Sequence, residues 1–141
     1  MASKFGEQVR ANNEKVKRRQ LAIFRSSTQR VMEIASVPEA QGGRMPIDTG
    51  FLTNSVLAST SGMPGSAGQP VALVLLQVQL GASVFVGWTA AYAMRMEYGF
   101  MGQDSLGREY SQSGKAFLRG ALQQWTNIVN DATIEARKAI P

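Results

Sequence analysis

Residues 115–138 read KAFLRGALQQWTNIVNDATIEARK, and this stretch decides the fold. Its apolar residues recur every three or four positions, which is the spacing of one helix face. Arg137 and Lys138 fall in the last turn, where the helix dipole favours cations. The pattern therefore predicts a long amphipathic helix with Leu122 and Trp125 in the middle of its buried stripe, which comprises Phe117, Leu118, Ala121, Leu122, Trp125, Ile128, Val129, Ala132 and Ala136.

A second long helix is predicted at the other end of the chain, over residues 1–36. From residue 3 onward this segment contains no proline and a single glycine, Gly6. A continuous helix of that length would run about 45–50 Å at 1.5 Å per residue, which exceeds the body of a domain this size. Apolar residues are sparse before Ile23 and frequent after it. We therefore expect the second half to pack and the first half to project, with Pro38 ending the helix.

The middle of the chain carries the strand signals. Residues 71–80 and 83–88 are rich in β-branched and apolar side chains and are separated by Gly81-Ala82, which predicts a β-hairpin over 71–88. Alternation of Leu76, Val78 and Leu80 with glutamines predicts one buried strand face. The remaining expectations are an extended segment at 55–60, a short helix at 90–98 closed by Gly99, and long loops at 61–70 and 100–114.

Together these elements predict an α+β fold in a single domain of residues 1–141. The small antiparallel sheet would consist of the 71–88 hairpin and one or two further strands, covered by the long N-terminal helix and the amphipathic C-terminal helix. Residues 37–141 would hold the sheet, the short helices and the C-terminal helix. A chain of 141 residues is long enough to bury a core without covalent cross-links.

Composition excludes several classes of chemistry. The sequence has no cysteine and no histidine, which removes disulfides, zinc fingers, thiol nucleophiles and histidine-based triads. No apolar run reaches about 18 residues, so no membrane span is expected, and no signal peptide is recognisable at the N-terminus. We expect no cofactor, no metal, no catalytic site and a cytosol-like compartment.

The positive charge of the chain is concentrated in its first 30 residues. They hold eight lysines and arginines and two glutamates, a net charge of +6, whereas residues 31–141 hold seven basic and eight acidic residues, a net charge of −1. Such a bias suits a polyanion or an acidic protein surface. The candidate contact residues are Lys15, Lys17, Arg18 and Arg19. The alternative is a solvated helix face without a partner.

The triplet Asp48-Thr49-Gly50 also occurs at the catalytic aspartate of aspartic proteases. That chemistry needs two such aspartates sharing a proton, and therefore a dimer of a chain this short. The bulky Phe51 after the triplet and the long helices at both ends favour another explanation, in which Asp48 or Thr49 caps a short helix.

Two further features have competing interpretations. Tyr92, Tyr98, Phe100 and Tyr110 could form a surface on which bases stack, but aromatics of this kind more often fill a core or a subunit contact. Glu97 could be a lone acid in a site, but a helix cap or an ion pair is the favoured role.

Two motifs carry a family resemblance. Pro46-x-Asp48-Thr49-Gly50-x-Leu52-x-x-Ser55 is followed by Tyr92-Ala93-x-x-x-Glu97-x-Gly99, and then by the helix that begins at Phe117-Leu118. In this order the motifs resemble a family of tail-completion proteins of long-tailed (siphovirus-type) bacteriophages, also called tail-component or head–tail joining proteins. The resemblance covers about residues 5–138. The glycine-rich loop 61–70 and Phe100, where a small hydroxyl residue is common, depart from the pattern.

The resemblance implies a structural virion protein of the neck or tail, made in the bacterial host cytoplasm. Its copies would form a ring of six or twelve subunits around the DNA channel, against neighbouring connector and tail-terminator or tail-tube proteins. Genomic DNA in the channel would be a further, non-specific contact. The motif residues would serve as scaffold, with a cap at Asp48-Thr49, a tight backbone approach at Gly50, and Tyr92 and Glu97 fixing the second short helix.

Two destinations for the basic segment stay open under this family assignment, the DNA in the channel and an acidic surface on a neighbour. The competing function is a nucleic-acid-binding regulatory protein that uses the basic N-terminal helix.

Overall fold

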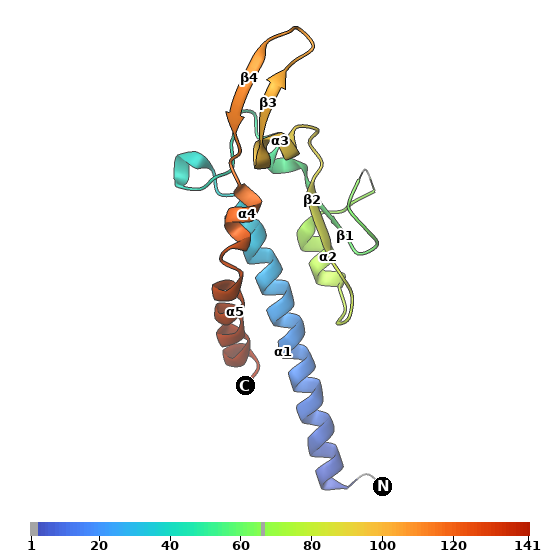
Figure 1. Cartoon of the computed structure of the whole chain (residues 1–141). Coiled ribbons are helices and arrows are strands. Elements are labelled where there is room, and N and C mark those ends of the chain that lie inside the picture. Colours follow the sequence, from blue (N-terminus) through green and yellow to red (C-terminus); the bar gives the residue numbers. More distant parts are fainter. Residues whose placement is uncertain (1–2, 66) are drawn as a thin grey trace.

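The computed structural model describes residues 3–65 and 67–141 and shows an α+β fold built around one long helix (Figure 1). This helix, α1, spans Lys4–Ala35, as the sequence predicts. The Ser3 hydroxyl accepts a hydrogen bond from the Gly6 N–H at 3.0 Å and caps its start. The helix ends before Pro38, where the Ser36 N–H still reaches carbonyls of the last turn.

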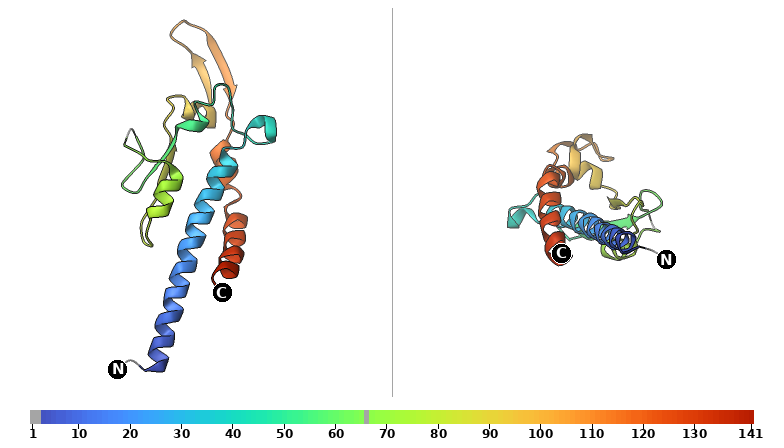
Figure 2. Two further views of the ribbon diagram at one scale, coloured as in Figure 1. Left: turned by 180° about the vertical axis from the view of Figure 1, so that it is seen from behind. Right: turned by 90° about the horizontal axis from the view of Figure 1, so that it is seen from below.

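The two halves of α1 have different surroundings. Its buried residues, Ser27, Val31, Met32 and Ala35, all lie in the second half. The first half extends away from the rest of the molecule, and a hairpin of strands β3 (Gly99–Gln103) and β4 (Glu109–Ser113) projects from the opposite end (Figures 1 and 2). Near the midpoint, the Arg19 guanidinium donates a hydrogen bond to the Ile140 carbonyl oxygen at 2.6 Å, which ties the C-terminal end of the chain to α1.

The strands form two separate antiparallel pairs. Strand β1 (Val56–Ser59) pairs with β2 (Phe85–Trp88), with Val56 opposite Trp88. Strand β3 (Gly99–Gln103) pairs with β4 (Glu109–Ser113), with Gly99 opposite Ser113. The extended segment predicted at 55–60 is thus confirmed as β1. Helix α1 lies between the β1–β2 pair on one side and the C-terminal helices on the other (Figure 2).

The predicted hairpin over 71–88 is wrong. Helix α2 (Val71–Gln77) occupies its first half, and only Phe85–Trp88 forms a strand, whose partner is β1 rather than residues 71–80. Leu76 and Leu80, expected on a buried strand face, are 72% and 43% exposed.

Burial explains why residues 71–77 are helical. The buried side chains are Val74, Leu75 and Val78, which share one side of a helical turn rather than alternate positions. Arg25 of α1 donates hydrogen bonds to the Leu76 and Val78 carbonyl oxygens, both at 3.1 Å, and so satisfies carbonyls at the end of α2. Tertiary contact with α1 therefore overrides the β-propensity of the segment.

The loop predicted at 100–114 is also wrong, because β3 and β4 occupy most of it. Asp104 organises the turn: its Oδ1 accepts hydrogen bonds from the Leu106 and Arg108 N–H groups at 2.9 Å, and its Oδ2 pairs with the Arg108 guanidinium at 2.6 Å. Partial desolvation alone would raise the pKa of Asp104, but hydrogen bonds from Arg108, Leu106 and Tyr110 outweigh it and lower the pKa below its ordinary value. The other predicted loop, 61–70, contains Ser66, which lies outside the described residues; its end pairs with β1 through an isolated bridge between Ala58 and Gln69.

The C-terminal helix is interrupted rather than continuous. Helices α4 (Phe117–Leu122) and α5 (Trp125–Ala139) are separated by a turn at residues 123–124. The placement of Leu122 and Trp125 in the middle of the buried stripe is wrong, because these side chains are 47% and 43% exposed. The rest of the predicted stripe is confirmed in α5, which buries Ile128, Ala132 and Ala136.

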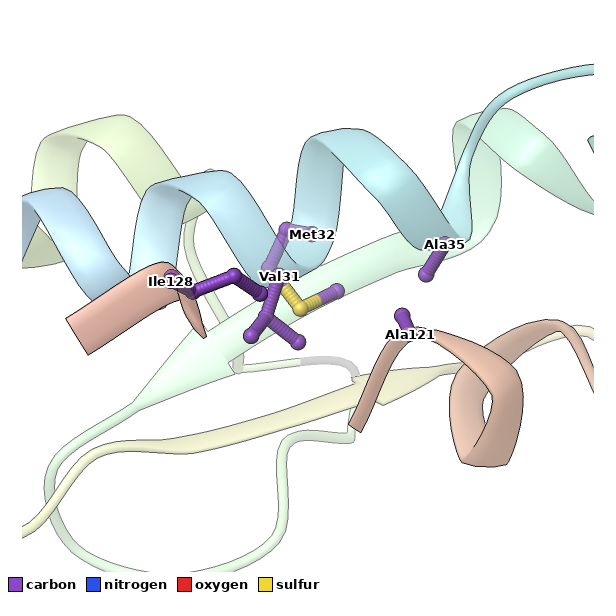
Figure 3. Packing of buried hydrophobic residues seen from close by; sticks show 5 residues of the cluster. All are labelled: Val31, Met32, Ala35, Ala121 and Ile128. Carbon is purple, nitrogen blue, oxygen red and sulfur yellow. The ribbon is translucent and has the colours of Figure 1, made fainter. Parts of the chain in front are cut away.

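The core consists of two connected clusters. In the first, Val31, Met32 and Ala35 of α1 face Ala121 and Ile128 of the C-terminal helices (Figure 3). The second contains Met45, Leu52, Ala90 and Phe117. Both clusters contact Trp88 and Leu118, which join them. None of the helices in the described part of the chain has both the length and the apolarity of a membrane span.

Three short helices complete the fold. Helix α3 (Ala93–Tyr98) ends at Gly99, which adopts a φ of +90°, and thus matches the short helix predicted at 90–98. Two 3₁₀ helices, η1 (Glu39–Gln41) and η2 (Thr53–Ser55), lie in the connection from α1 to β1.

The interrupted C-terminal helix predicts unequal effects of two matched substitutions. Ile128→Asp buries an unpaired carboxylate in the first cluster and should abolish folding, because its cost of several kcal/mol rivals the whole stability of a domain. Leu122→Asp, on the half-exposed side of α4, should remain folded. Circular dichroism and thermal unfolding of both variants test this pair. Loss of folding by Leu122→Asp alone would contradict the burial pattern.

Candidate functional site

The fold brings the two sequence motifs together. The Ser55 carbonyl oxygen accepts hydrogen bonds from the Thr89 N–H at 2.9 Å and from the Thr89 hydroxyl at 2.8 Å, which ties the end of the first motif to the chain just before the second. The rings of Phe51 and Tyr92 lie 6.2 Å apart, centroid to centroid. Leu52 is buried in the same cluster that Ala93 contacts. We call this meeting point of residues 46–55 and 92–99 the motif junction.

The structure places the ten motif residues at different depths in the motif junction. Leu52, Ser55 and Glu97 are buried; Pro46, Gly50, Ala93 and Gly99 are half-buried; Asp48, Thr49 and Tyr92 are exposed. A small pocket of about 190 Å³ draws its lining from both motifs, including Pro46, Asp48, Leu52 and Tyr92. Pockets for drug-sized ligands measure roughly 300–1,000 Å³, so this hollow is small for such a ligand.

The expected helix cap at Asp48-Thr49 is not formed. The helix that follows, η2, has no side-chain cap at its start, and the Thr49 hydroxyl accepts only a long hydrogen bond of 3.4 Å from the Phe51 N–H. The expected tight approach at Gly50 is wrong as well, because a Cβ there would come no closer than 3.4 Å to Asn54. Gly50 has a φ of +83°, and this left-handed conformation is what favours glycine.

Glu97 is the most highly connected of the motif residues. Its side chain is 6% exposed and lies beside the start of α4. Its carboxylate accepts hydrogen bonds from the N–H groups of Leu118 and Arg119 and from the Arg119 guanidinium, all at 3.0 Å. The predicted capping or ion-pair role is confirmed, and Glu97 performs both. It caps α4, which lies far along the sequence, and not its own helix.

The backbone around Glu97 is equally constrained. The Glu97 carbonyl oxygen accepts hydrogen bonds from the Ala116 N–H at 3.1 Å and from the Arg119 guanidinium at 2.8 Å. Ala116 has a φ of +51°, a left-handed conformation that costs an alanine of order 1–2 kcal/mol. A Cβ on Gly99 would lie 2.6 Å from the Gln112 carbonyl oxygen, and one on Gly114 would lie 2.5 Å from that of Glu97. The backbone of residues 97–99 therefore lies in direct contact with the backbone of residues 112–114.

Arg119 contacts the motif junction, and no sequence pattern predicts this contact. Besides its bonds to Glu97, its guanidinium lies 4.5 Å from the centroid of the Tyr98 ring, within cation–π range. No local signal points to it, because 22 residues separate it from Glu97 and its position on α4 resembles that of any exposed arginine.

The aromatic residues near the second motif do not fill the core. Tyr92, Tyr98 and Tyr110 are 40%, 64% and 42% exposed, which corrects the expectation of a core role. Nor do they form one stack, because Tyr92 faces Phe51, Tyr98 faces Arg119, and Phe100 lies 6.3 Å from Tyr110. The alternative, that these aromatic residues form a contact between subunits, stays a prediction.

Large apolar side chains are exposed at this end of the molecule. Met94 and Tyr98 of α3 and Met101 and Leu106 of the hairpin are each between 64% and 81% exposed. The β3–β4 hairpin is an isolated two-stranded pair, and such pairs are marginally stable in water on their own. This surface has the properties of one that another molecule covers.

The four basic candidates on α1 differ in their contacts. Lys17 lies 3.4 Å from Glu14 in an exposed pair, and Arg19 is held by the Ile140 carbonyl. Lys15 and Arg18 make no ion pair within the described residues. All four lie on the projecting part of α1 or at its base.

The contacts at the motif junction are hydrogen bonds, one ion pair and apolar packing. In the described part of the chain, no three acidic residues gather where they could hold a metal ion. Comparison with known proteins adds no relative: no family model, curated protein or solved structure matches this chain.

The geometry predicts that Glu97→Gln destabilises the protein. An amide can replace one acceptor oxygen but loses the charge and leaves a donor facing the α4 N–H groups, so the free energy of unfolding should fall by about 1–3 kcal/mol. Denaturant unfolding measures this change. The matched control is Glu109→Gln on the exposed hairpin, which should shift stability by less than about 0.5 kcal/mol. Equal effects of both substitutions would contradict the role of Glu97.

Proposed function

We propose that this protein is a structural component of the neck or tail of a long-tailed bacteriophage. Copies of it assemble as a ring of six or twelve subunits at the head–tail interface and complete or join the tail. The observation that carries the proposal is the convergence of the two family-like motifs on one rigid junction, where their residues make structural contacts.

The exposed surfaces support an assembly role. The α3 and hairpin surface is apolar and lies at one end of the molecule, and the projecting half of α1 lies at the other (Figure 1). A ring subunit needs at least two separate contact surfaces, because each copy touches a neighbour on either side. Further contacts to neighbouring connector and tail-terminator or tail-tube proteins would use the faces above and below the ring.

The motif junction itself favours a structural over a catalytic role. Asp48 is exposed to solvent, and Glu39, the other acid at its pocket, is paired with Lys115 at 3.2 Å rather than sharing a proton with Asp48. Glu97 already accepts hydrogen bonds from three donors and has little capacity left for proton transfer. We therefore propose no enzymatic activity.

A second candidate function is nucleic-acid binding by the first half of α1. Its support is the basic charge of the half-buried Lys15 and the exposed Arg18, which could contact phosphates without sequence specificity. In a neck ring the same residues could line the DNA channel, so DNA affinity alone does not separate the two functions.

The test is made on particles of a phage that encodes the chain. We expect mass spectrometry of purified virions to detect the protein and imaging of the neck to show it as a ring. Deleting its gene should yield filled heads and separate tails that do not join, and complementation with the wild-type gene should restore infectivity. Infectious particles that lack the protein would contradict the proposal. A protein absent from virions that binds DNA tightly at low salt would instead support the regulatory function.

A further inference from the structure

A groove of about 400 Å³ runs between the second half of α1 and α5. Its floor is apolar and consists of Ile34, Ile128 and Ala132, of which the last two are buried. Exposed polar side chains form its rim, among them three acids and one base: Glu33, Asp131, Glu135 and Arg30. The groove is therefore an apolar channel with an acidic edge.

The charges of the rim are available to a partner. Arg30 lies 3.3 Å from Glu33, and Glu135 lies 3.8 Å from Lys138 outside the groove. Both pairs are well exposed, and such pairs contribute little to stability. Replacing them with ion pairs to a partner therefore costs little free energy. Asp131 makes no ion pair within the described residues.

The first half of α1 has the complementary pattern. Phe5, Val9 and Val16 are 75%, 42% and 39% exposed and lie on one face, because residues 4, 7 and 11 positions apart share a side of a helix. At 100° per residue, Lys4 and Lys15 flank this face on one side and Arg10 and Lys17 flank it on the other, all about 100–120° from its centre. Arg18 lies on the opposite side of the helix. An amphipathic helix of this kind suits an apolar groove with charged edges.

The first half of α1 (residues 4–20, called the basic half below) cannot reach the groove of its own chain. The first half of α1 and the part of α1 that forms one wall of the groove belong to one continuous helix (Figure 2). The groove-lining residues of that wall come from its second half. The helix would have to break and reverse to bring them together. The contact is therefore between molecules. The first half of α1 is long enough to fill the groove, since residues 4–20 span about 24 Å and residues 124–135 of the groove about 17 Å at 1.5 Å per residue.

We infer that the basic half of α1 docks into the α1–α5 groove of a second copy of this chain. Residues 4–20 hold six basic and two acidic residues, and this net charge of +4 meets the acidic rim, while the face with Phe5, Val9 and Val16 covers the apolar floor. The contact is heterologous, because different surfaces of the two copies meet, and heterologous contacts generate rings when they close. The inference deepens the proposed function and rests on it, since it names the subunit contact of the ring.

Cysteine cross-linking tests the contact directly, because the chain has no cysteine of its own. One protein carries Asn12→Cys beside the apolar face of α1, and a differently tagged protein carries Asn127→Cys on the groove rim; both positions are exposed. A bis-maleimide reagent with a flexible spacer is added to the mixture. The control replaces the second protein by Gln41→Cys, an exposed site in η1. We expect about a tenfold higher yield of the mixed dimer with Asn127→Cys, because docking raises the local thiol concentration.

Charge reversal identifies the attraction that drives the contact. Lys4→Glu with Lys15→Glu in the helix-labelled protein should lower the mixed-dimer yield to the control level. Asp131→Lys with Glu135→Lys in the groove-labelled protein should do the same, and mixing the two reversed proteins should restore the yield. The matched control uses single substitutions: Arg18→Glu, on the side of α1 opposite the apolar face, changes net charge as much as Lys15→Glu and should leave most of the yield, whereas Lys15→Glu should lower it. High salt should weaken the wild-type contact.

The outcomes separate this inference from the proposed function. Equal yields at Asn127 and Gln41, or no recovery when the reversed proteins are mixed, would overturn the inference. If the protein is nevertheless found as a ring in virions, the phage function holds and the subunit contact is another one. If the specific cross-link forms but the protein is absent from virions, the copies associate in this way and the phage function is wrong.

Discussion

The buried Glu97 carboxylate caps α4 from a distant part of the sequence, and the arrangement of the upper half of the molecule depends on this interaction. By binding the N–H groups of Leu118 and Arg119, it fixes the direction of α4 as it leaves the β3–β4 hairpin. That direction places Phe117 4.9 Å from Trp88 in an edge-to-face contact and inserts Ala121 against α1. The left-handed conformation of Ala116 persists because these bonds surround it.

The molecule is organised along α1 into a packed centre and two projecting ends. The centre holds the two core clusters, joined through Trp88 and Leu118. The hairpin end exposes apolar side chains, and the N-terminal end exposes basic ones beside an apolar stripe. Neither end contributes a residue to the two core clusters.

The candidate site could be predicted from the sequence only in part. The two motifs are visible as residue types at fixed spacing, and the capping or ion-pair role of Glu97 follows from a lone carboxylate on a short apolar helix. The partner of that carboxylate could not be found, because Arg119 lies 22 residues away and only the fold places it there. The Asp48-Thr49 cap was inferred from local pattern alone, and the structure uses Gly50 for a turn with positive φ instead.

Elements whose stability is local could be predicted from the residues within them. A run from residue 3 to 36 with a serine cap, no proline and one glycine forms α1, and Gly99 ends α3, because helix propensity, capping and φ preferences act within a few residues. Tertiary structure decided the rest. Residues 71–77 carry apolar side chains that suit a strand or a helix, and contact with Arg25 and the side of α1 selects the helix. The apolar stripe of residues 117–136 is continuous in the sequence, but the turn at 123–124 divides it. The start of α4 is hydrogen-bonded to Glu97, whereas α5 packs along α1.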